Sequence, residues 1–219
     1  MTSPHWPLTG LRLRTPRLEL RWPTLSDLDE LAALAVDGVH DRDVQPFGVA
    51  WTDAPAAELP SRTLRYFWGQ WGAWRLYDWT LHLVAVHDGA VVGTQAMRGR
   101  DFTVLREVRT GSWLGRRHHR QGLGTEMRAA VLSLAFDGLR AEYALSTAHC
   151  DNAASLGVSR KLGYANDGIE RLVVRERPVT AQRLRLDRAS WLAHRYLPVE
   201  TSGLEPCLPW FGLAASGQA

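Results

Sequence analysis

Residues 115–127 read GRRHHRQGLGTEM, a run of six polar side chains followed by two glycines and the start of a helical pattern. Glycines let a ligand approach the backbone closely, and the free N–H groups and dipole of a helix start favour an anion. Arg120 adds a side chain that can form a charge-assisted hydrogen bond. The stretch therefore predicts an anion site, with a solvated basic surface loop as the alternative.

Two common nucleotide-binding motifs do not fit this stretch. A Walker loop needs Lys followed by Ser or Thr after its second glycine, and neither is present. A Rossmann fingerprint needs a third glycine, where Met127 stands, and a turn directly after the strand. A polar run instead separates Leu114 from Gly122. Both nucleotide-binding interpretations are therefore disfavoured.

The sequence on either side of the loop predicts strands mixed with helices. Alternating leucines over 11–22 predict a strand interrupted near Pro16, and leucine spacing over 23–36 predicts a helix capped by Thr24 or Ser26. The patterns then predict a long loop or an interrupted helix over 38–60 and a helix with an aromatic stripe over 61–77. After these come a strand–turn–strand over 79–97, a strand over 104–115 and a helix over 124–139. They continue with a strand over 142–149, an Asn-capped helix over 152–164, a strand pair over 168–177 and 181–188, and a helix over 189–197.

These elements predict one α/β domain built on a mixed sheet, because the sequence shows no internal repeat and no linker. Gly111 lies inside a predicted strand and suggests a bulge or a close backbone approach. Residues 198–219 are rich in Gly and Pro. They predict an irregular tail, packed on or extending from a domain that spans 1–197.

The composition excludes several other classes of protein. The 219 residues are 45% apolar and 22% charged with a net charge of +3, which is ordinary for a soluble globular protein and does not favour a nucleic-acid partner. Cys150 and Cys207 are too few for a disulfide scaffold and have no metal-ligand spacing, so we expect a cytoplasmic protein without a metal. The sequence shows no apolar signal segment and no run of about 18 apolar residues, so no membrane association is expected.

The order of the motifs resembles that of the GNAT acetyltransferase superfamily. The resembling features are a strand ending in SWLG, the basic run, RQGLGTE opening a helix, a further strand, DNAAS and KLGY. They span roughly residues 11–190, and the early LRTPRLELR is similar to the branch that includes ribosomal-protein N-terminal acetyltransferases. The resemblance implies a single-domain fold with a central, mixed, mostly antiparallel sheet that is twisted, flanked by helices and splayed at the cofactor site.

The resemblance also implies where acetyl-CoA binds. In the family, a loop of Arg or Gln, two residues, Gly, one residue, then Gly or Ala binds the pyrophosphate through its amides. The corresponding residues here are His119, Arg120, Gln121, Gly122, Leu123, Gly124 and Thr125. His119 departs from the Arg or Gln of that pattern. The backbone of Trp113, Leu114 and Gly115 is expected to pair with the pantetheine arm, and a splay near Gly111 would open the sheet for it.

Acetylation of an amine needs two proton transfers, and the sequence offers a candidate for each. By resemblance, Asn152 contacts the cofactor and Ser155 serves the departing thiolate; the alternative roles are helix N-cap and first-turn polar residue. Related sequences often carry a Glu where Arg109 stands. Glu107 lies two residues earlier on the same strand face, so it is a candidate base or else the partner of an arginine.

The main hypothesis is an acetyl-CoA-dependent N-acetyltransferase in which a primary amine attacks the thioester directly. The alternative is a non-catalytic acyl-CoA-binding sensor or scaffold, because the strand Glu is missing. No covalent intermediate through Cys150 is expected, since no nearby residue is clearly arranged to activate it. The acceptor stays open between a peptide N-terminus, an aminoglycoside-like drug and a small metabolite amine. The resemblance alone favours a homodimer.

Overall fold

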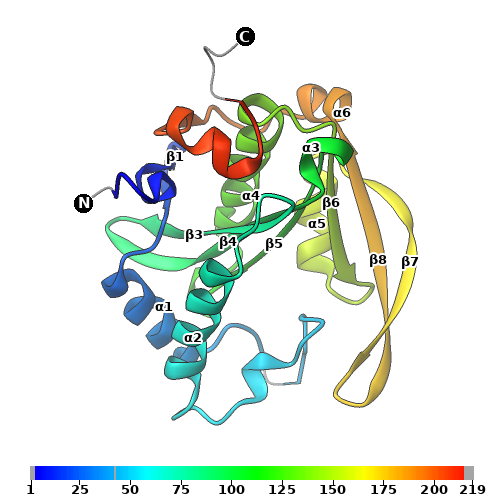
Figure 1. Ribbon diagram of the computed structural model, residues 1–219. Helices are drawn as coiled ribbons and strands as arrows, with labels where there is room; N and C mark the ends of the chain where they lie inside the picture. The colour runs from blue at the N-terminus through cyan, green and yellow to red at the C-terminus, as the bar shows by residue number, and fades with distance from the viewer. Residues whose placement is uncertain (1–2, 42, 215–219) are drawn as a thin grey trace.

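The computed structural model describes residues 3–41 and 43–214, in which helices cover both faces of one twisted sheet (Figure 1). The strands are β1 (Arg12–Arg14), β2 (Leu18–Arg21), β3 (Asp78–His87), β4 (Ala90–Arg100), β5 (Glu107–Leu114), β6 (Tyr143–His149), β7 (Ala165–Val174), β8 (Arg177–Asp187) and β9 (Glu200–Ser202). The α-helices are α1 (Leu25–Asp37), α2 (Leu59–Gly72), α3 (Phe102–Leu105), α4 (Leu123–Ser133), α5 (Ala153–Lys161) and α6 (Arg188–Ala193). The 3-10 turns are η1 (Pro7–Gly10), η2 (Trp51–Asp53), η3 (Arg116–His118) and η5 (Glu205–Phe211), and a π turn, η4 (Leu134–Gly138), continues α4.

Within the described residues, the strands form one sheet in the order β7-β8-β6-β5-β4-β3-β2-β1-β9. Every neighbouring pair in this part of the chain is antiparallel except β5 and β6, which run parallel. The mixed, mostly antiparallel sheet flanked by helices is therefore confirmed. The parallel pair lies inside the sheet, where it matters for the site described below.

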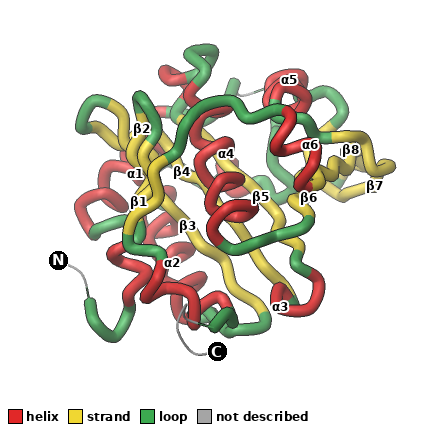
Figure 2. The backbone as a smooth tube through the Cα atoms, turned by 90° about the horizontal axis from the view of Figure 1, so that it is seen from above, coloured by secondary structure: helices red, strands yellow, loops and turns green. Residues whose placement is uncertain are grey.

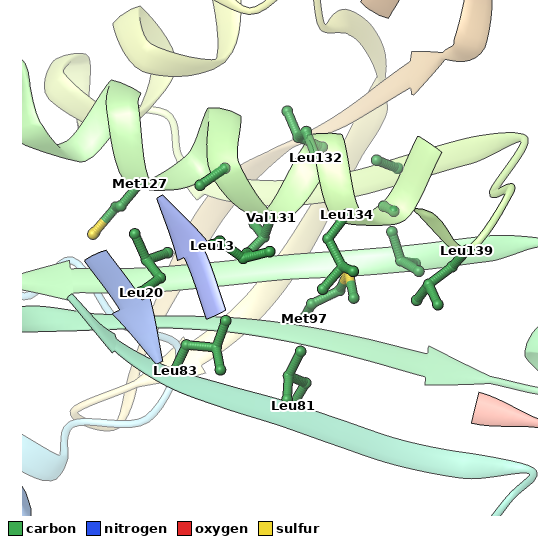
Figure 3. Packing of buried hydrophobic residues seen from close by; sticks show 14 of the residues in the cluster. Leu13, Leu20, Leu81, Leu83, Met97, Met127, Val131, Leu132, Leu134 and Leu139 are labelled. Carbon is green, nitrogen blue, oxygen red and sulfur yellow. The ribbon is translucent and has the colours of Figure 1, made fainter. Parts of the chain in front are cut away.

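Helix α4 lies across one face of the sheet and is buried along most of its length (Figure 2). Figure 3 shows Met127 and Val131 of this helix above side chains of four strands. The strand residues beneath it are completely buried: Leu13, Leu20, Leu81, Leu83 and Met97. Nearly all of its side chains are buried, including the charged Glu126 and Arg128, so α4 is a core helix rather than a surface helix. Burial of this many apolar side chains is the main stabilisation of the fold.

Helices α1 and α2 cover the opposite face of the sheet. Leu28 and Leu31 of α1 and Phe67 of α2 pack on Val84 and Val86 of β3. Leucines three residues apart in α1 place their side chains on one face of the helix, as the sequence predicted. The sheet therefore has α4 on one face and α2 on the other.

The predicted start of the chain is confirmed. β1 and β2 pair antiparallel with Arg12 opposite Arg21, and the turn between them holds Pro16. Helix α1 begins with a capping box, in which the side chains of Thr24 and Asp27 each accept a hydrogen bond from the other residue's backbone N–H. Thr24 rather than Ser26 is the cap.

The tail is more regular than the sequence predicted. Strand β9 pairs with β1 and extends the sheet, with Thr201 opposite Leu13. The following turn, η5, buries Cys207 and Phe211 in the main core. Gly and Pro in this segment permit the turns, but the apolar side chains between them anchor it to the domain. Residues 215–219 lie outside the described residues.

The bulge expected at Gly111 is wrong. The register of β4 and β5 is continuous through Ala96 opposite Gly111, and the shift in the neighbouring pair lies between Ala85 and Val86 of β3. A Cβ added at Gly111 would meet no atom of the described residues within 4 Å, so no other protein segment approaches this glycine closely on that side. In the same strand pair it is Gly93 that has a close neighbour, because an added Cβ would overlap the Trp113 carbonyl oxygen. Among the helices of the described residues, none has the length and apolar character needed to span a lipid bilayer.

Candidate active site

The sheet opens between β5 and β6. These strands pair only from Glu107 opposite Tyr143 to Arg109 opposite Leu145. Beyond those positions β5 continues beside β4 while β6 continues beside β8. The facing edges at 110–114 and 146–149 are therefore not paired with each other. The expected splay is confirmed, and it begins one residue before Gly111.

Polar contacts bridge the closed end of this gap. Arg109 Nη1 donates to Thr147 Oγ1 at 3.3 Å, across the opening between the strands. Tyr164, which follows α5, brings its hydroxyl to 3.3 Å from Thr110 Oγ1 on the α4 side of the sheet. Burial raises the pKa of Tyr164, so its hydroxyl is protonated at neutral pH. The gap thus has protonated hydroxyls close to the point where the strands part.

The loop at the other end of the gap presents a row of free amides. Among the described residues, the backbone N–H groups of 120–124 have no hydrogen-bond acceptor. Gly122 is the N-cap of α4 with φ +80°, a conformation that glycine adopts without strain, and no side chain caps the helix. The next two amides, those of Thr125 and Glu126, both bond the Gly122 carbonyl oxygen. Free donors at a helix start form a site for an anion.

An ion pair holds this loop against the start of the sheet. Glu126 is 2% exposed, and its carboxylate accepts from Thr15 Oγ1 at 2.7 Å and from Arg17 Nε at 2.7 Å. Arg17 also donates from Nη1 to the Gln121 carbonyl oxygen at 2.9 Å. The guanidinium is therefore in contact with the loop itself. The sequence patterns did not predict a role for Arg17 or Glu126. A lone carboxylate in the first turn of a core helix could have indicated that Glu126 needs a charged partner.

Side chains of the loop have local partners of their own. His119 Nε2 lies 3.0 Å from the Leu114 carbonyl oxygen, and Gln121 Nε2 donates to the Arg117 carbonyl oxygen at 3.0 Å. Leu123 is buried, so only its backbone can reach a ligand. Arg120 is exposed, with φ +59°. Backbone donors thus dominate the loop, with Arg120 as the basic side chain left to contact an anion.

Asn152 caps α5 beside the open edge of β6. Its Oδ1 accepts from the Ser155 backbone N–H at 3.0 Å, which confirms the capping alternative for this side chain. The carbonyl oxygen of Ser155 accepts from Ser159 Oγ at 3.0 Å. The Ser155 hydroxyl itself has no partner within the described part of the chain. It is half-buried in the first turn of the helix, so it is available to a ligand.

A buried arginine lies behind these groups. Arg128 of α4 is 5% exposed and donates from Nη1 to Ser159 Oγ at 2.9 Å. Its Nε has no partner in the portion of the chain that the structure describes. Burial lowers the pKa of Arg128, with Tyr164 as a compensating neighbour. A cation in this position gives the space between α4 and α5 a positive potential.

Glu107 lies at the closed end of the gap. It shares a sheet face with Arg109 and Gly111, as the sequence predicted. Its Oε2 accepts from Arg185 Nη1 of β8 at 3.2 Å. The ion pair that the sequence analysis left as the alternative is thus present, and Glu107 does not line the large cavity described next.

A cavity of about 1050 Å³ lies on the α2 side of the sheet. Its floor includes His82 of β3, Ala96 of β4 and Gly111 of β5, and its wall includes Trp113. The cavity therefore reaches β5 at Gly111 and Trp113, where β5 is no longer paired with β6. A long reactant in the gap and a second reactant in the cavity would meet at the sheet.

A family model for the acetyltransferase (GNAT) domain matches residues 17–165. The chain belongs to the GNAT acetyltransferase family. The match ends at the first residue of β7 and includes the loop, the gap and the cavity floor.

Solved GNAT structures share the fold of this GNAT domain. RimJ of Mycobacterium smegmatis, solved with CoA-disulfide, has 17% identity and a TM-score of 0.69, over 84% of this chain and 90% of its own. A GCN5-related N-acetyltransferase of Brucella melitensis has 18% identity and a TM-score of 0.64, over 84% of this chain and 81% of its own. RimL, a ribosomal L7/L12 α-N-protein acetyltransferase solved with CoA, has 14% identity and a TM-score of 0.59, over 79% of this chain and 95% of its own.

The residues expected to bind the cofactor in this GNAT domain come from three segments of the chain. Those at 113–115 end β5, those at 119–125 form the loop and the first turn of α4, and Asn152 and Ser155 begin α5. The structure brings these segments to the rim of the gap between β5 and β6. Glu107 is separated from them at the closed end.

Proposed function

We propose that this protein transfers an acetyl group from acetyl-CoA to a primary amine. The observation that carries the proposal is the row of free amides at 120–124, at the mouth of the only parallel strand pair among the described residues. Such a row suits a diphosphate, and the open strand edge beyond it suits an extended amide-containing arm. The CoA compounds in the RimJ and RimL structures support this assignment.

The chain offers a separate contact for each part of acetyl-CoA. The amides of 120–124 and the side chain of Arg120 would hold the diphosphate. The backbone at 113–115 would pair with the pantetheine arm, and Asn152 and Ser155 would contact its far side. The thioester would then lie near Gly111, where the structure has open space and no side chain.

The reaction needs the amine in its neutral form beside the thioester carbonyl. The amine nitrogen forms a bond to the acetyl carbon, the carbon–sulfur bond breaks, and CoA leaves as the thiolate. Ser155 donates a hydrogen bond to that sulfur, or passes on to it the proton that the nitrogen loses as the amide forms, because its hydroxyl is free and half-buried. Arg128 favours the negative charge from behind. Glu107 takes the ammonium proton through water; its pairing with Arg185 is the competing role.

A sensor or scaffold that binds acyl-CoA without turnover is the second candidate. The observation that favours it is the Glu107–Arg185 ion pair, which engages the carboxylate that would otherwise act as the base. Turnover separates the two. An enzyme releases free CoA in proportion to acetylated amine, whereas a sensor binds acetyl-CoA and releases none.

Calorimetric titration with acetyl-CoA, beside AMP, ATP and NAD, tests the site. We expect micromolar binding of acetyl-CoA and at least tenfold weaker binding of the other three, since they lack the pantetheine arm. An assay of free thiol release with a panel of amines then tests catalysis. Preference for a plain nucleotide would remove the assignment of the loop and, with it, the proposed activity.

A further inference from the structure

Five aromatic rings line the cavity on the α2 side of the sheet. Phe47 and Trp51 come from the segment between α1 and α2, with ring centroids 5.4 Å apart, and Trp51 lies 5.5 Å from Trp113 of β5. Tyr66 and Phe67 of α2 line the cavity as well. These five rings come from three separate parts of the chain. Large rigid rings contribute most of the apolar contact that a small-molecule pocket makes.

The charges of the lining do not suit a polycation. Glu58 is the one carboxylate among the described lining residues, and it already pairs with Arg62 at 2.8 Å. Arg65 adds a further positive charge. A polyamine or aminoglycoside would bring several positive charges into a lining whose net charge is already positive. Like charges placed side by side are unfavourable, so this lining disfavours a polycation.

One buried polar side chain in the floor has no partner. His82 is 4% exposed, and neither ring nitrogen has a hydrogen-bond partner within the described residues. Its neighbours are the rings of Tyr66 and Phe67, at centroid distances of 5.3 and 5.2 Å. A buried imidazole without hydrogen bonds is unfavourable, because its donor and acceptor have lost their contacts with water and gained none in the protein. A bound polar group would remove that penalty.

The register of the sheet connects His82 with the splay. His82 is opposite Ala96, and Ala96 is opposite Gly111, so the three lie in a row across β3, β4 and β5. Directly paired residues share a sheet face, and neighbouring strands are about 5 Å apart. Between the imidazole and the gap lie Ala96, whose side chain is a methyl group, and Gly111, which has no side chain. The row is thus a floor along which a small ligand can reach from His82 to the gap.

We propose that the acceptor is a small amine with an aromatic or bulky apolar body, held in this cavity with His82 as its hydrogen-bonding partner. The aromatic rings would receive the body, and the amine would approach the splay along the row of small residues. Burial keeps the imidazole neutral, so it has one donor and one acceptor nitrogen for a ligand at neutral pH. The inference rests on the proposed function, because it names the acceptor of that reaction.

The test compares four amines in the thiol-release assay. They are 2-phenylethylamine, spermidine, kanamycin and the peptide Ala-Ala-Ala, each with saturating acetyl-CoA. We expect kcat/KM for 2-phenylethylamine to exceed that of the other three at least tenfold. A preference for any of the other three would overturn the proposal. The proposal would also be overturned if protein that binds acetyl-CoA failed to acetylate 2-phenylethylamine. That result would not contradict the assignment of the cofactor site.

Two pairs of variants locate the binding site. His82→Leu should raise KM for 2-phenylethylamine at least fivefold with an unchanged Kd for acetyl-CoA, while His87→Leu on the same strand should change neither. Trp51→Ala should lower kcat/KM for the same amine, and Trp68→Ala, at an exposed position outside the cavity, should not. His82→Leu should fold, because it removes an unsatisfied polar group from a buried site. Wild-type KM in a folded His82→Leu protein would overturn the role of His82. If the wild-type protein did not bind acetyl-CoA, the proposed function would be overturned, and the proposal about its acceptor would fail as well.

Discussion

Arg17 and Glu126 are 109 residues apart in the sequence, yet Arg17 Nε donates to Glu126 Oε2 at 2.7 Å. This pair joins the turn between β1 and β2 to the first turn of α4. The same guanidinium bonds the Gln121 carbonyl oxygen, within the row of free amides. The first segment of the chain therefore helps to set the conformation of a loop that begins a hundred residues later.

Removal of this cation should weaken both the fold and the loop. In Arg17→Ala the buried Glu126 carboxylate loses its charged partner, so we expect the free energy of unfolding to fall by about 1–3 kcal/mol. The Kd for acetyl-CoA should rise about tenfold, because the loop loses a contact at Gln121. Urea unfolding and calorimetric titration measure the two effects. Arg14→Ala, which removes a more exposed pair with Glu19, is the control. An unchanged Kd in Arg17→Ala would limit the pair to a role in stability.

The amides of the loop can be tested at Gly124. Gly122 is unsuitable because its φ of +80° strains any other residue. At Gly124, an added Cβ meets Leu114 at an ordinary 3.6 Å, so Gly124→Ala should bind acetyl-CoA like the wild type. Gly124→Pro removes one free N–H at the second helical position, where α2 already has a proline. We expect a tenfold or larger increase in Kd for the proline variant alone. Equal affinities would show that the amide does not contact the ligand.

Two hydroxyls near the gap, those of Ser155 and Tyr164, are candidates for the contact with the departing thiolate. Ser155→Ala should lower kcat at least tenfold and leave the Kd for acetyl-CoA within about twofold, because the hydroxyl acts chiefly in the transition state. Tyr164→Phe should have a smaller effect, since its hydroxyl is already bonded to Thr110. Pre-steady-state thiol release measures the chemical step for both. The reverse order of effects would transfer the role of acid to Tyr164.

Burial of His82 should make stability depend on pH. The fold lowers the pKa of this imidazole from 6.5 to about 4, because the buried site disfavours its charged form. Above pH 6.5 both the folded and unfolded states hold it neutral, so its full contribution is present. As the pH falls from 6.5 to 4, the unfolded state binds a proton that the folded state does not, and stability is lost. The loss attributable to His82 is at most about 3 kcal/mol.

Urea unfolding of wild type and His82→Leu at pH 7.5, 5.5 and 4 measures this loss. We expect the wild type to lose more stability than the variant over that range, with the difference developing below pH 6.5. Parallel curves for the two proteins would show that His82 is protonated in the folded state or exposed to water.

Much of the fold follows from local patterns in the sequence. Leucine spacing predicts α1, alternating leucines predict β1 and β2, the Asp-Gly turn predicts the pair of β3 and β4, and the glycine loop predicts the start of α4. The tail is an exception, because Gly and Pro describe its turns but not the burial of Cys207 and Phe211. Gly111 is a second exception, because a glycine inside a predicted strand is equally compatible with a bulge and with open space above the strand. The resemblance, not periodicity, implied the splay between β5 and β6.

The candidate site likewise has some features that the local sequence predicts and others that depend on the tertiary structure. The sequence by itself determined the anion loop and the Asn152 cap, because both depend on residues within a few positions of each other. Only the tertiary structure showed that Arg17 pairs with Glu126 and that Arg185 pairs with Glu107. It alone showed that the ring nitrogens of His82 have no hydrogen-bond partner among the described residues. Ion pairs and cavities depend on which distant segments the sheet places side by side. That placement follows from strand order and register, which local periodicity does not encode.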